Sequence, residues 1–226
     1  MAHAGWIKHL AASITLTLPV IAYAQSLDTI MATCAPNVHP TTMAALIRTE
    51  SKGNPYALSD SGLEGQPWSV RQRTIRSFAP SSAAEAEQIA TNLIASGHIV
   101  DIGLTQVSSR NLARYNLSVR DALDPCMNVR TGGQILSAFY RDALPKYQDS
   151  NAALLAALSA FNTGNFRSGL SNGYVDRILR AGGMDVPALL ARTPTTSGRP
   201  AYAADRPTRY VPLASKFAVL AATVSQ

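Results

Sequence analysis

The chain has 226 residues, a length that suits one domain with extensions, and 46% of them are hydrophobic, which is enough for a core. The formal net charge is +6, but the basic residues are mostly scattered and are not interleaved with aromatic residues. This pattern argues against nucleic-acid binding and leaves two readings, an anionic wall polymer or lipid surface as partner, or a solvated basic face without a partner.

The N-terminal segment is typical of a secretory signal peptide. Lys8 is the one fixed charge before an apolar run over residues 10–20, and Ala22-Tyr23-Ala24 forms a small-x-small cleavage site. We therefore expect residues 1–24 to be removed and the mature chain to be periplasmic, with a charge of +6 less one for Lys8, or +5. The run is short for a bilayer span, although an uncleaved anchor is the alternative. No later apolar stretch is long enough to predict a stable membrane span after signal removal.

The chain has two cysteines, Cys34 and Cys126. In an oxidising compartment they allow one intramolecular disulfide, which would stabilise the fold by roughly 4 kcal/mol in the chain-entropy model. Neither belongs to a CxxC motif, and only His39 and His98 would remain after signal removal, so we expect no metal site. The sequence also contains no phosphate loop and no dinucleotide fingerprint, so we expect no cofactor.

Apolar periodicity and capping residues predict a mainly helical domain over residues 25–192. The expected helices cover residues 41–52, 82–96, 106–115, 126–143, 151–161 and 174–181, with a short one at 186–191. Thr41 or Thr42 would cap the first helix, and residues 56–78 would form a small β-hairpin or irregular loop. Residues 99–103 would be a linker.

The composition changes after Arg192. Four prolines follow up to residue 212, together with threonine, serine and glycine, and this composition is typical of extended or disordered chain. We therefore expect residues 193–226 to form a flexible C-terminal tail outside the helical domain.

Glu50 is the acidic residue whose position suggests chemistry. It shares a helix face with three apolar residues at i−7, i−4 and i−3, which are Met43, Leu46 and Ile47. Loss of water there and the negative end of the helix dipole would both raise the pKa of this carboxyl. A carboxyl protonated near neutral pH can act as a general acid on a glycosidic oxygen. The alternative is that Glu50 turns out to water or pairs with Arg48 or Lys52.

Three later positions suit a sugar-binding cleft, each with a plainer alternative. The amide of Gln106 in Gly103-Leu104-Thr105-Gln106 can bind sugar hydroxyls and acetamido groups, or the motif is a turn before a helix. Asn162 in Phe161-Asn162-Thr163-Gly164 ends an apolar helix, where Asn162 or Gly164 would also serve as a C-cap. Tyr174 is either a cleft residue or part of the core.

The set of motifs in this order resembles the lytic transglycosylase family, which has a lysozyme-like fold. The motifs are Glu50-Ser51, Gly103-Leu104-Thr105-Gln106, Phe161-Asn162-Thr163-Gly164 and Tyr174-Val175. Several further features are similar to the subgroup that accompanies type IV secretion and conjugation systems. These are the spacing between the first two motifs, Asn54-Pro55-Tyr56-Ala57, Asp101-Ile102, and the positions of Cys34 and Cys126. The resemblance covers about residues 34–180.

The resemblance implies an enzyme that cleaves the MurNAc–GlcNAc β-1,4 bond of peptidoglycan glycan strands, with type IV secretion components as partners. Glu50 would protonate that bond and then act as a base. Ser51 would hydrogen-bond near Glu50 or the substrate, and Tyr174 would lie near Glu50. Gln106 and Asn162 would line the cleft. The family usually has tyrosine where this chain has Phe161, so a substrate contact at this position would be lost or replaced.

The number of carboxyl groups at the site separates two reactions. Ordinary glycosidases use a pair, for which Asp60 and Asp101 are the candidates, although Asp101 suits a cap or loop role better. With one carboxyl group, the acetamido group of the substrate assists and the 6-hydroxyl of muramic acid attacks, which gives a 1,6-anhydro product. The alternatives are a lysozyme-type hydrolase of the same bond and a catalytically weak wall-binding assembly module, which Phe161 favours.

Overall fold

The computed structural model describes residues 1, 25–147 and 149–183. The predicted cleavage region before Gln25, the short helix at 186–191 and the tail at 193–226 therefore lie outside the described residues. Within the described ranges, no helix is long and apolar enough to cross a membrane.

Helices dominate the fold, and a small sheet accompanies them. The helices are α1 (Leu27–Cys34), α2 (Pro40–Ser51), α3 (Trp68–Arg71), α4 (Ala83–Ala95), α5 (Val119–Leu123), α6 (Pro125–Ala143), α7 (Ser150–Thr163), α8 (Ser168–Ser171) and α9 (Tyr174–Ala181). The strands are β1 (Leu58–Leu63), β2 (Arg76–Phe78), β3 (His98–Ile102) and β4 (Val107–Ser108), which form an antiparallel sheet in the order β2-β1-β3-β4. The predicted class, mainly helical with a small β region, is confirmed.

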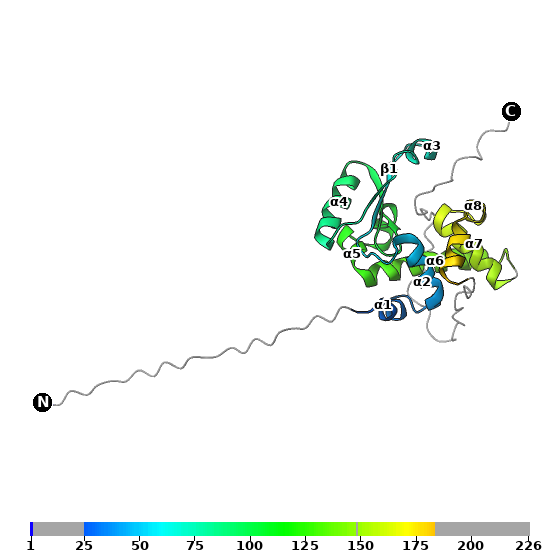
Figure 1. Ribbon diagram of the computed structural model, residues 1–226, viewed down its shortest axis with the longest axis horizontal. Coiled ribbons are helices and arrows are strands. Elements are labelled where there is room, and N and C mark those ends of the chain that lie inside the picture. Colours follow the sequence, from blue (N-terminus) through cyan, green and yellow to red (C-terminus); the bar gives the residue numbers. More distant parts are fainter. Residues whose placement is uncertain (2–24, 148, 184–226) are drawn as a thin grey trace.

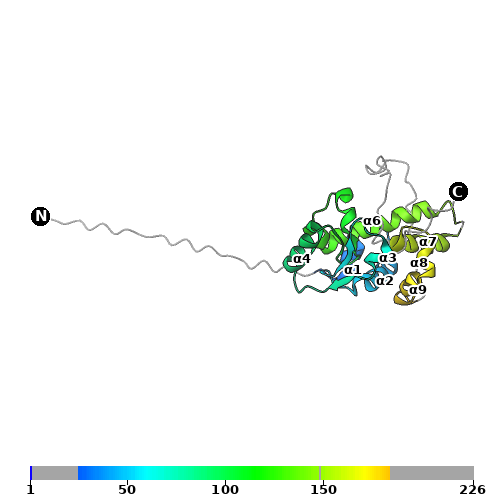
Figure 2. The same ribbon diagram turned by 90° about the horizontal axis from the view of Figure 1, so that it is seen from above.

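The elements form two sides around helix α6. The sheet and the helices α4 and α5 form the sheet side, while α7, α8 and α9, with α2 packed on α9, form the helical side, and α6 runs between them (Figures 1 and 2). The larger apolar core joins α1, α2, α6, α7 and α9 and includes Met43, Leu46, Leu158 and Ile178. A smaller core, which includes Leu58 and Ile102, packs the sheet against α4 and α5. The space between the two sides is where the polar motifs meet.

The disulfide between Cys34 and Cys126 is present, with a Cα–Cα distance of 5.4 Å, so this prediction is confirmed. It joins the last residue of α1 to the first turn of α6. The two cysteines are 92 residues apart, and the loop that they close contains α2 and the whole sheet.

Two predictions between the sheet and α6 were wrong. Residues 99–103 are not a linker, because residues 98–102 form β3, which pairs with β1. Residues 106–115 are not a helix, because β4 and two 3₁₀ turns at 109–111 and 113–115 occupy this segment. The reason is non-local, since the backbone hydrogen bonds of β3 go to strands on either side, and this pairing overrides the weak local preference.

Helix α2 begins one residue earlier than predicted and has a different cap. The ring of His39 accepts a hydrogen bond from the backbone N–H of Thr41 at 3.2 Å, and Pro40 occupies the first helical position. Neither Thr41 nor Thr42 is the cap. The helix ends at Ser51, one residue before the predicted end, and Lys52 and Gly53 follow with positive φ angles of 57° and 84°. This ending turns the chain away directly after Glu50 and Ser51.

Candidate active site

Helix α2 places Glu50 at the boundary between the core and a cleft. Met43, Leu46 and Ile47 on the same face are 1% exposed or less, whereas Glu50, in the last turn, is half-buried. The hydroxyl of Tyr174, the first residue of α9, donates a hydrogen bond to Oε1 of Glu50. Tyr174 itself is buried. The carboxyl group therefore has a neutral phenol as a partner, in a partly desolvated position.

A cleft of about 650 Å³ lies between the helical and sheet sides, and Glu50 lines it. Four other residues expected at a substrate site also line it, namely Ser51, Gln106, Asn162 and Tyr174. Further lining residues from the helical side are Lys52 and Arg177, and from the sheet side Leu58, Ser59, Ser77, Phe78 and Asp101. Tertiary packing thus gathers motifs from four separate stretches of the chain.

Gln106 projects from the turn that joins β3 to β4. Its side-chain nitrogen donates to the carbonyl oxygens of Ala57 at 3.0 Å and Gly103 at 2.9 Å. Its backbone has φ 51°, a left-handed conformation that a non-glycine residue adopts at some cost. Because both amide hydrogens are engaged by the backbone, the amide oxygen is the group that can accept a hydrogen bond from a sugar hydroxyl or acetamido N–H.

The buried side chain of Asn128 on α6 holds this turn in place. Its nitrogen donates to the carbonyl oxygens of Ile102 at 2.8 Å and Ala122 at 2.7 Å. Its oxygen accepts from the backbone N–H and the hydroxyl of Thr105, both at 2.8 Å. The backbone of the turn lies very close to Asn128, since a Cβ added at Gly103 would lie 2.4 Å from the side-chain nitrogen of Asn128. Sequence reasoning missed Asn128; the adjacent glycines in the middle of α6 were the available signal of close packing.

Asn162 and Ser51 make mainly local contacts. The oxygen of Asn162 accepts a hydrogen bond from Asn172 at 3.1 Å. The hydroxyl of Ser51 donates to the carbonyl of Ile47 at 3.1 Å and accepts from the N–H of Gly53 at 3.2 Å, which closes the end of α2. Gly164, with φ 76°, is the C-cap of α7. Asn162 is therefore not the cap, and it lines the cleft.

The structure does not bring Phe161 to the cleft. Its side chain is completely buried in the larger core, and it is absent from the residues that line the cleft. A substrate contact through Phe161 therefore stays a sequence-based prediction, and the geometry gives it no support.

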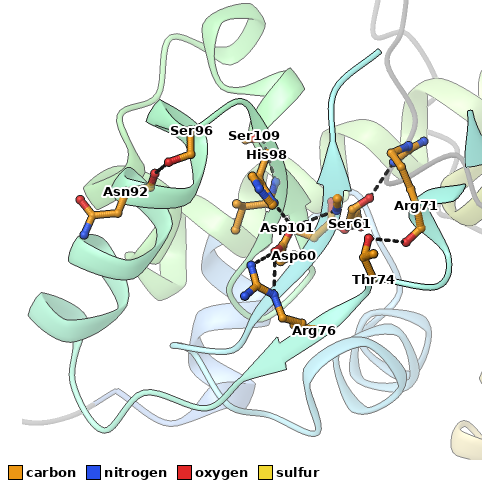
Figure 3. Close-up of polar contacts among 12 residues, drawn as sticks. Asp60, Ser61, Arg71, Thr74, Arg76, Asn92, Ser96, His98, Asp101 and Ser109 are labelled. Carbon is orange, nitrogen blue, oxygen red and sulfur yellow. Dashed lines mark hydrogen bonds and ion pairs between the residues drawn. The ribbon is translucent and has the colours of Figure 1, made fainter. Parts of the chain in front are cut away.

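Asp60 belongs to a polar network on the sheet, away from the cleft lining (Figure 3). Its carboxylate accepts hydrogen bonds from Arg76, at 3.1 Å and 2.6 Å, and from the N–H of Gly62 at 2.9 Å, and it lies 2.8 Å from the ring of His98. Burial raises the pKa of Asp60, but the hydrogen bonds from Arg76, His98 and Gly62 together outweigh it and lower that pKa below its usual value. Asp60 is therefore a structural anion.

Asp101 is the second carboxyl group of the cleft. It lies on β3 opposite Ser59 of β1 and accepts a hydrogen bond from the hydroxyl of Ser61 at 2.9 Å (Figure 3). The buried guanidinium of Arg71 donates to the carbonyl of Ser61 at 2.9 Å and lies near enough to Asp101 for their charges to interact. Among the described residues, no group of three or more His, Cys, Asp or Glu side chains could hold a metal ion.

Comparisons with known proteins found one family model and several similar proteins. Residues 29–177 match the family model described as the transglycosylase SLT domain. The chain is similar to the protein virB1 of Agrobacterium fabrum, with 33% identity over 159 residues, which cover 70% of this chain and 60% of that protein. It is also similar to the type IV secretion system protein virB1 of Brucella suis biovar 1, with 37% identity over 152 residues, which cover 65% of this chain and 59% of that protein. The chain thus spans about three fifths of the length of these relatives. No solved structure matches it.

Proposed function

Because this chain belongs to the transglycosylase SLT family, we propose that it is a periplasmic peptidoglycan lytic transglycosylase that cleaves the MurNAc–GlcNAc β-1,4 bond. Two of the similar proteins are virB1 proteins, and the name of one places it in a type IV secretion system. These similarities support a role in opening the wall locally for a type IV secretion or conjugation apparatus.

The observation that carries the proposal is the placement of Glu50. Its carboxyl group lies in the cleft with the Tyr174 hydroxyl on one oxygen, and the apolar face of α2 continues beneath it. In the first step, Glu50 gives its proton to the O4 of the departing GlcNAc as the glycosidic bond breaks. Tyr174 donates to the carboxylate that forms and so stabilises it. Because this donor is neutral, it favours the ionised form of the carboxyl group less than a cationic donor would.

The second step returns the proton to Glu50. The 2-acetamido group of MurNAc supports the positive charge at C1, and the 6-hydroxyl of the same sugar then attacks C1. Glu50, now a carboxylate, takes the proton of that hydroxyl. The product is a 1,6-anhydro sugar, no water is consumed, and the enzyme regains its starting protonation state. Gln106 and Asn162, which line the cleft, would bind the hydroxyl and acetamido groups and orient the sugar.

One observation favours the hydrolase alternative. Asp101 also lines the cleft, so the cleft contains two carboxyl groups, the number that ordinary glycosidases use. The binding-module alternative rested on Phe161, which lies in the core and does not line the cleft.

The product distinguishes the proposal from both alternatives. Purified sacculi would be incubated with the protein and the released muropeptides weighed by mass spectrometry. A lytic transglycosylase releases products that end in 1,6-anhydro-MurNAc, which are one water lighter than the reducing products of a hydrolase. Release of reducing ends alone would favour the hydrolase, and no release by folded protein would favour the binding module. The same digestion with Glu50→Gln shows whether the release depends on the assigned acid.

A further inference from the structure

Arg177 is a cation in the cleft that the reaction described above does not use. It lies on α9, three residues after Tyr174, and its guanidinium carbon is 5.7 Å from the centre of the Tyr174 ring. A Cβ on Gly173 would lie 3.7 Å from one of its terminal nitrogens. The side chain is therefore folded back toward the start of α9, the end of the helix that meets Glu50, and it lines the same cleft.

The polar contacts of Arg177 differ from those of other arginines. Several others give their N–H groups to an oxygen of the protein, namely Arg48, Arg71, Arg76, Arg110 and Arg120. The side chain of Arg177 is exposed and makes the ring contact, but within the described residues its guanidinium forms no hydrogen bond or ion pair. Its five N–H donors are thus available to a ligand in the cleft. Lys52, which ends α2, adds a second positive charge to the same lining.

The two positive charges of Arg177 and Lys52 favour an anionic ligand in the cleft. A positive charge in a cleft favours the ionised form of any nearby carboxyl group, and that form cannot act as an acid. An anion bound at the guanidinium would offset this effect while the substrate is present. A guanidinium held in place by an aromatic ring is also well prepared to bind a carboxylate through two parallel hydrogen bonds.

We propose that Arg177 binds a carboxylate of the glycan strand and so makes the cleft selective for muramoyl strands over neutral GlcNAc polymers. The inference rests on the proposed function, because it identifies the substrate class of the same cleft. Two sources of the carboxylate share this chemistry, the lactyl group of a peptide-free muramic acid and the carboxyl groups of an attached peptide. Lys52 would add attraction over a longer distance without fixing the geometry.

The test is binding to protein that also carries Glu50→Gln, so that no ligand is cleaved. Three ligands of equal sugar number would be titrated by calorimetry: a peptide-bearing glycan fragment, the same fragment after an amidase has removed the peptide, and a neutral chito-oligosaccharide. Arg177→Gln should weaken binding of at least one anionic ligand by about 10- to 100-fold and leave the neutral ligand within about twofold. Arg177→Lys should recover part of the loss, because it restores the charge but not the planar pair of donors.

Arg180→Gln is the matched control. It removes the same charge from an exposed position on the same helix, but Arg180 does not line the cleft, so binding of all three ligands should stay unchanged. Weaker binding of the peptide-bearing fragment alone would identify the peptide as the source of the carboxylate. Weaker binding of the stripped fragment would identify the lactyl group.

Equal weakening of all three ligands by Arg177→Gln would overturn the inference, because Arg177 would then only support Tyr174. Unchanged binding of both anionic ligands would overturn it too. Neither result depends on turnover. Failure of the proposed function would be seen separately, as protein with Glu50 intact that binds glycan but releases no muropeptide from sacculi.

Discussion

The helical and sheet sides of the molecule surround their carboxyl groups with different hydrogen-bond donors. On the helical side, Glu50 of α2 has the neutral hydroxyl of Tyr174 as a hydrogen-bond partner. On the sheet side, Asp60 of β1 is fixed by the guanidinium of Arg76 and the ring of His98. A guanidinium donor stabilises a carboxylate strongly, whereas a neutral hydroxyl donor stabilises it less. We infer that the partners of a carboxyl group, together with its burial, separate the proposed acid Glu50 from Asp60, an anion that stabilises the sheet.

The comparison also explains why Asp60 is buried without harm to the fold. Its side chain is 1% exposed, and a lone charge there would be strongly destabilising. The hydrogen bonds from Arg76, His98 and Gly62 compensate for this cost. They also connect β2, β3 and the bulged end of β1 to the same carboxylate. Asp101 lies between these extremes, since it lines the cleft but accepts a hydrogen bond from Ser61 within the sheet.

The largest expected effect on activity is that of Glu50→Gln. The amide keeps the shape but cannot donate the proton, so cleavage of purified sacculi should fall by about 10²- to 10⁴-fold. The fold should survive, because the amide can still accept a hydrogen bond from Tyr174. Turbidity clearance measures the rate, and circular dichroism checks the fold.

The controls for Glu50 are on the sheet side. Asp60→Asn and Asp101→Asn should each lose much less activity than Glu50→Gln when assayed under conditions where they are folded. Wall clearance by folded Glu50→Gln at the parent rate would remove Glu50 as the acid. An equally inactive Asp101→Asn would make a two-carboxyl hydrolase the better account.

Removal of the disulfide should have the next largest effect. Replacing Cys34 and Cys126 by serine frees a loop of 92 residues, and the free energy of unfolding should fall by about 4 kcal/mol in the chain-entropy model. Urea unfolding of the parent and the double variant measures the difference. The parent treated with a reductant should match the variant. Full labelling of both thiols in unreduced parent protein would contradict the bridge.

Asp60→Asn should lower the stability of the fold. The amide loses the ion pair with Arg76, which is itself partly exposed, so the free energy of unfolding should fall by about 2 kcal/mol at neutral pH. Because the pKa of Asp60 is lowered in the folded protein, its stabilisation is present above the unfolded value of about 4. It is lost as the pH falls from there through the folded pKa.

Unfolding measured as a function of pH checks this sign. The parent should lose stability below about pH 4 more steeply than Asp60→Asn, so the two curves should converge in acid. A constant difference between the curves at all pH values would show that Asp60 is not held as an anion.

The smallest expected effect is that of Tyr174→Phe. The ring stays in the core and only the hydrogen bond to Glu50 is lost, so cleavage should slow by about tenfold, or roughly 1.4 kcal/mol in the activation barrier. The melting temperature should change little. Wall cleavage at the parent rate would show that the phenol is not needed to stabilise the carboxylate of Glu50.

Local pattern was sufficient for much of the helical side. The limits of α9 at residues 174–181 were predicted as observed, and the helix predicted over residues 82–96 is present as α4 (Ala83–Ala95). The apolar face that carries Glu50 on α2 follows from the 3.6-residue period, which needs no distant partner. The family resemblance rests on four short motifs whose order is itself a property of the sequence.

Other features were decided only by tertiary structure. Strand β3 and the left-handed turn at Gln106 depend on bonds to β1 and to Asn128 on α6, which no local window contains. Tyr174 meets Glu50 across 124 residues, and Arg177 reaches the cleft because α9 packs on α2. A helical or strand period is read along the chain, whereas hydrogen bonds and charges act through space. Sequence alone therefore predicted Glu50 as the acid, and packing determined which groups surround it.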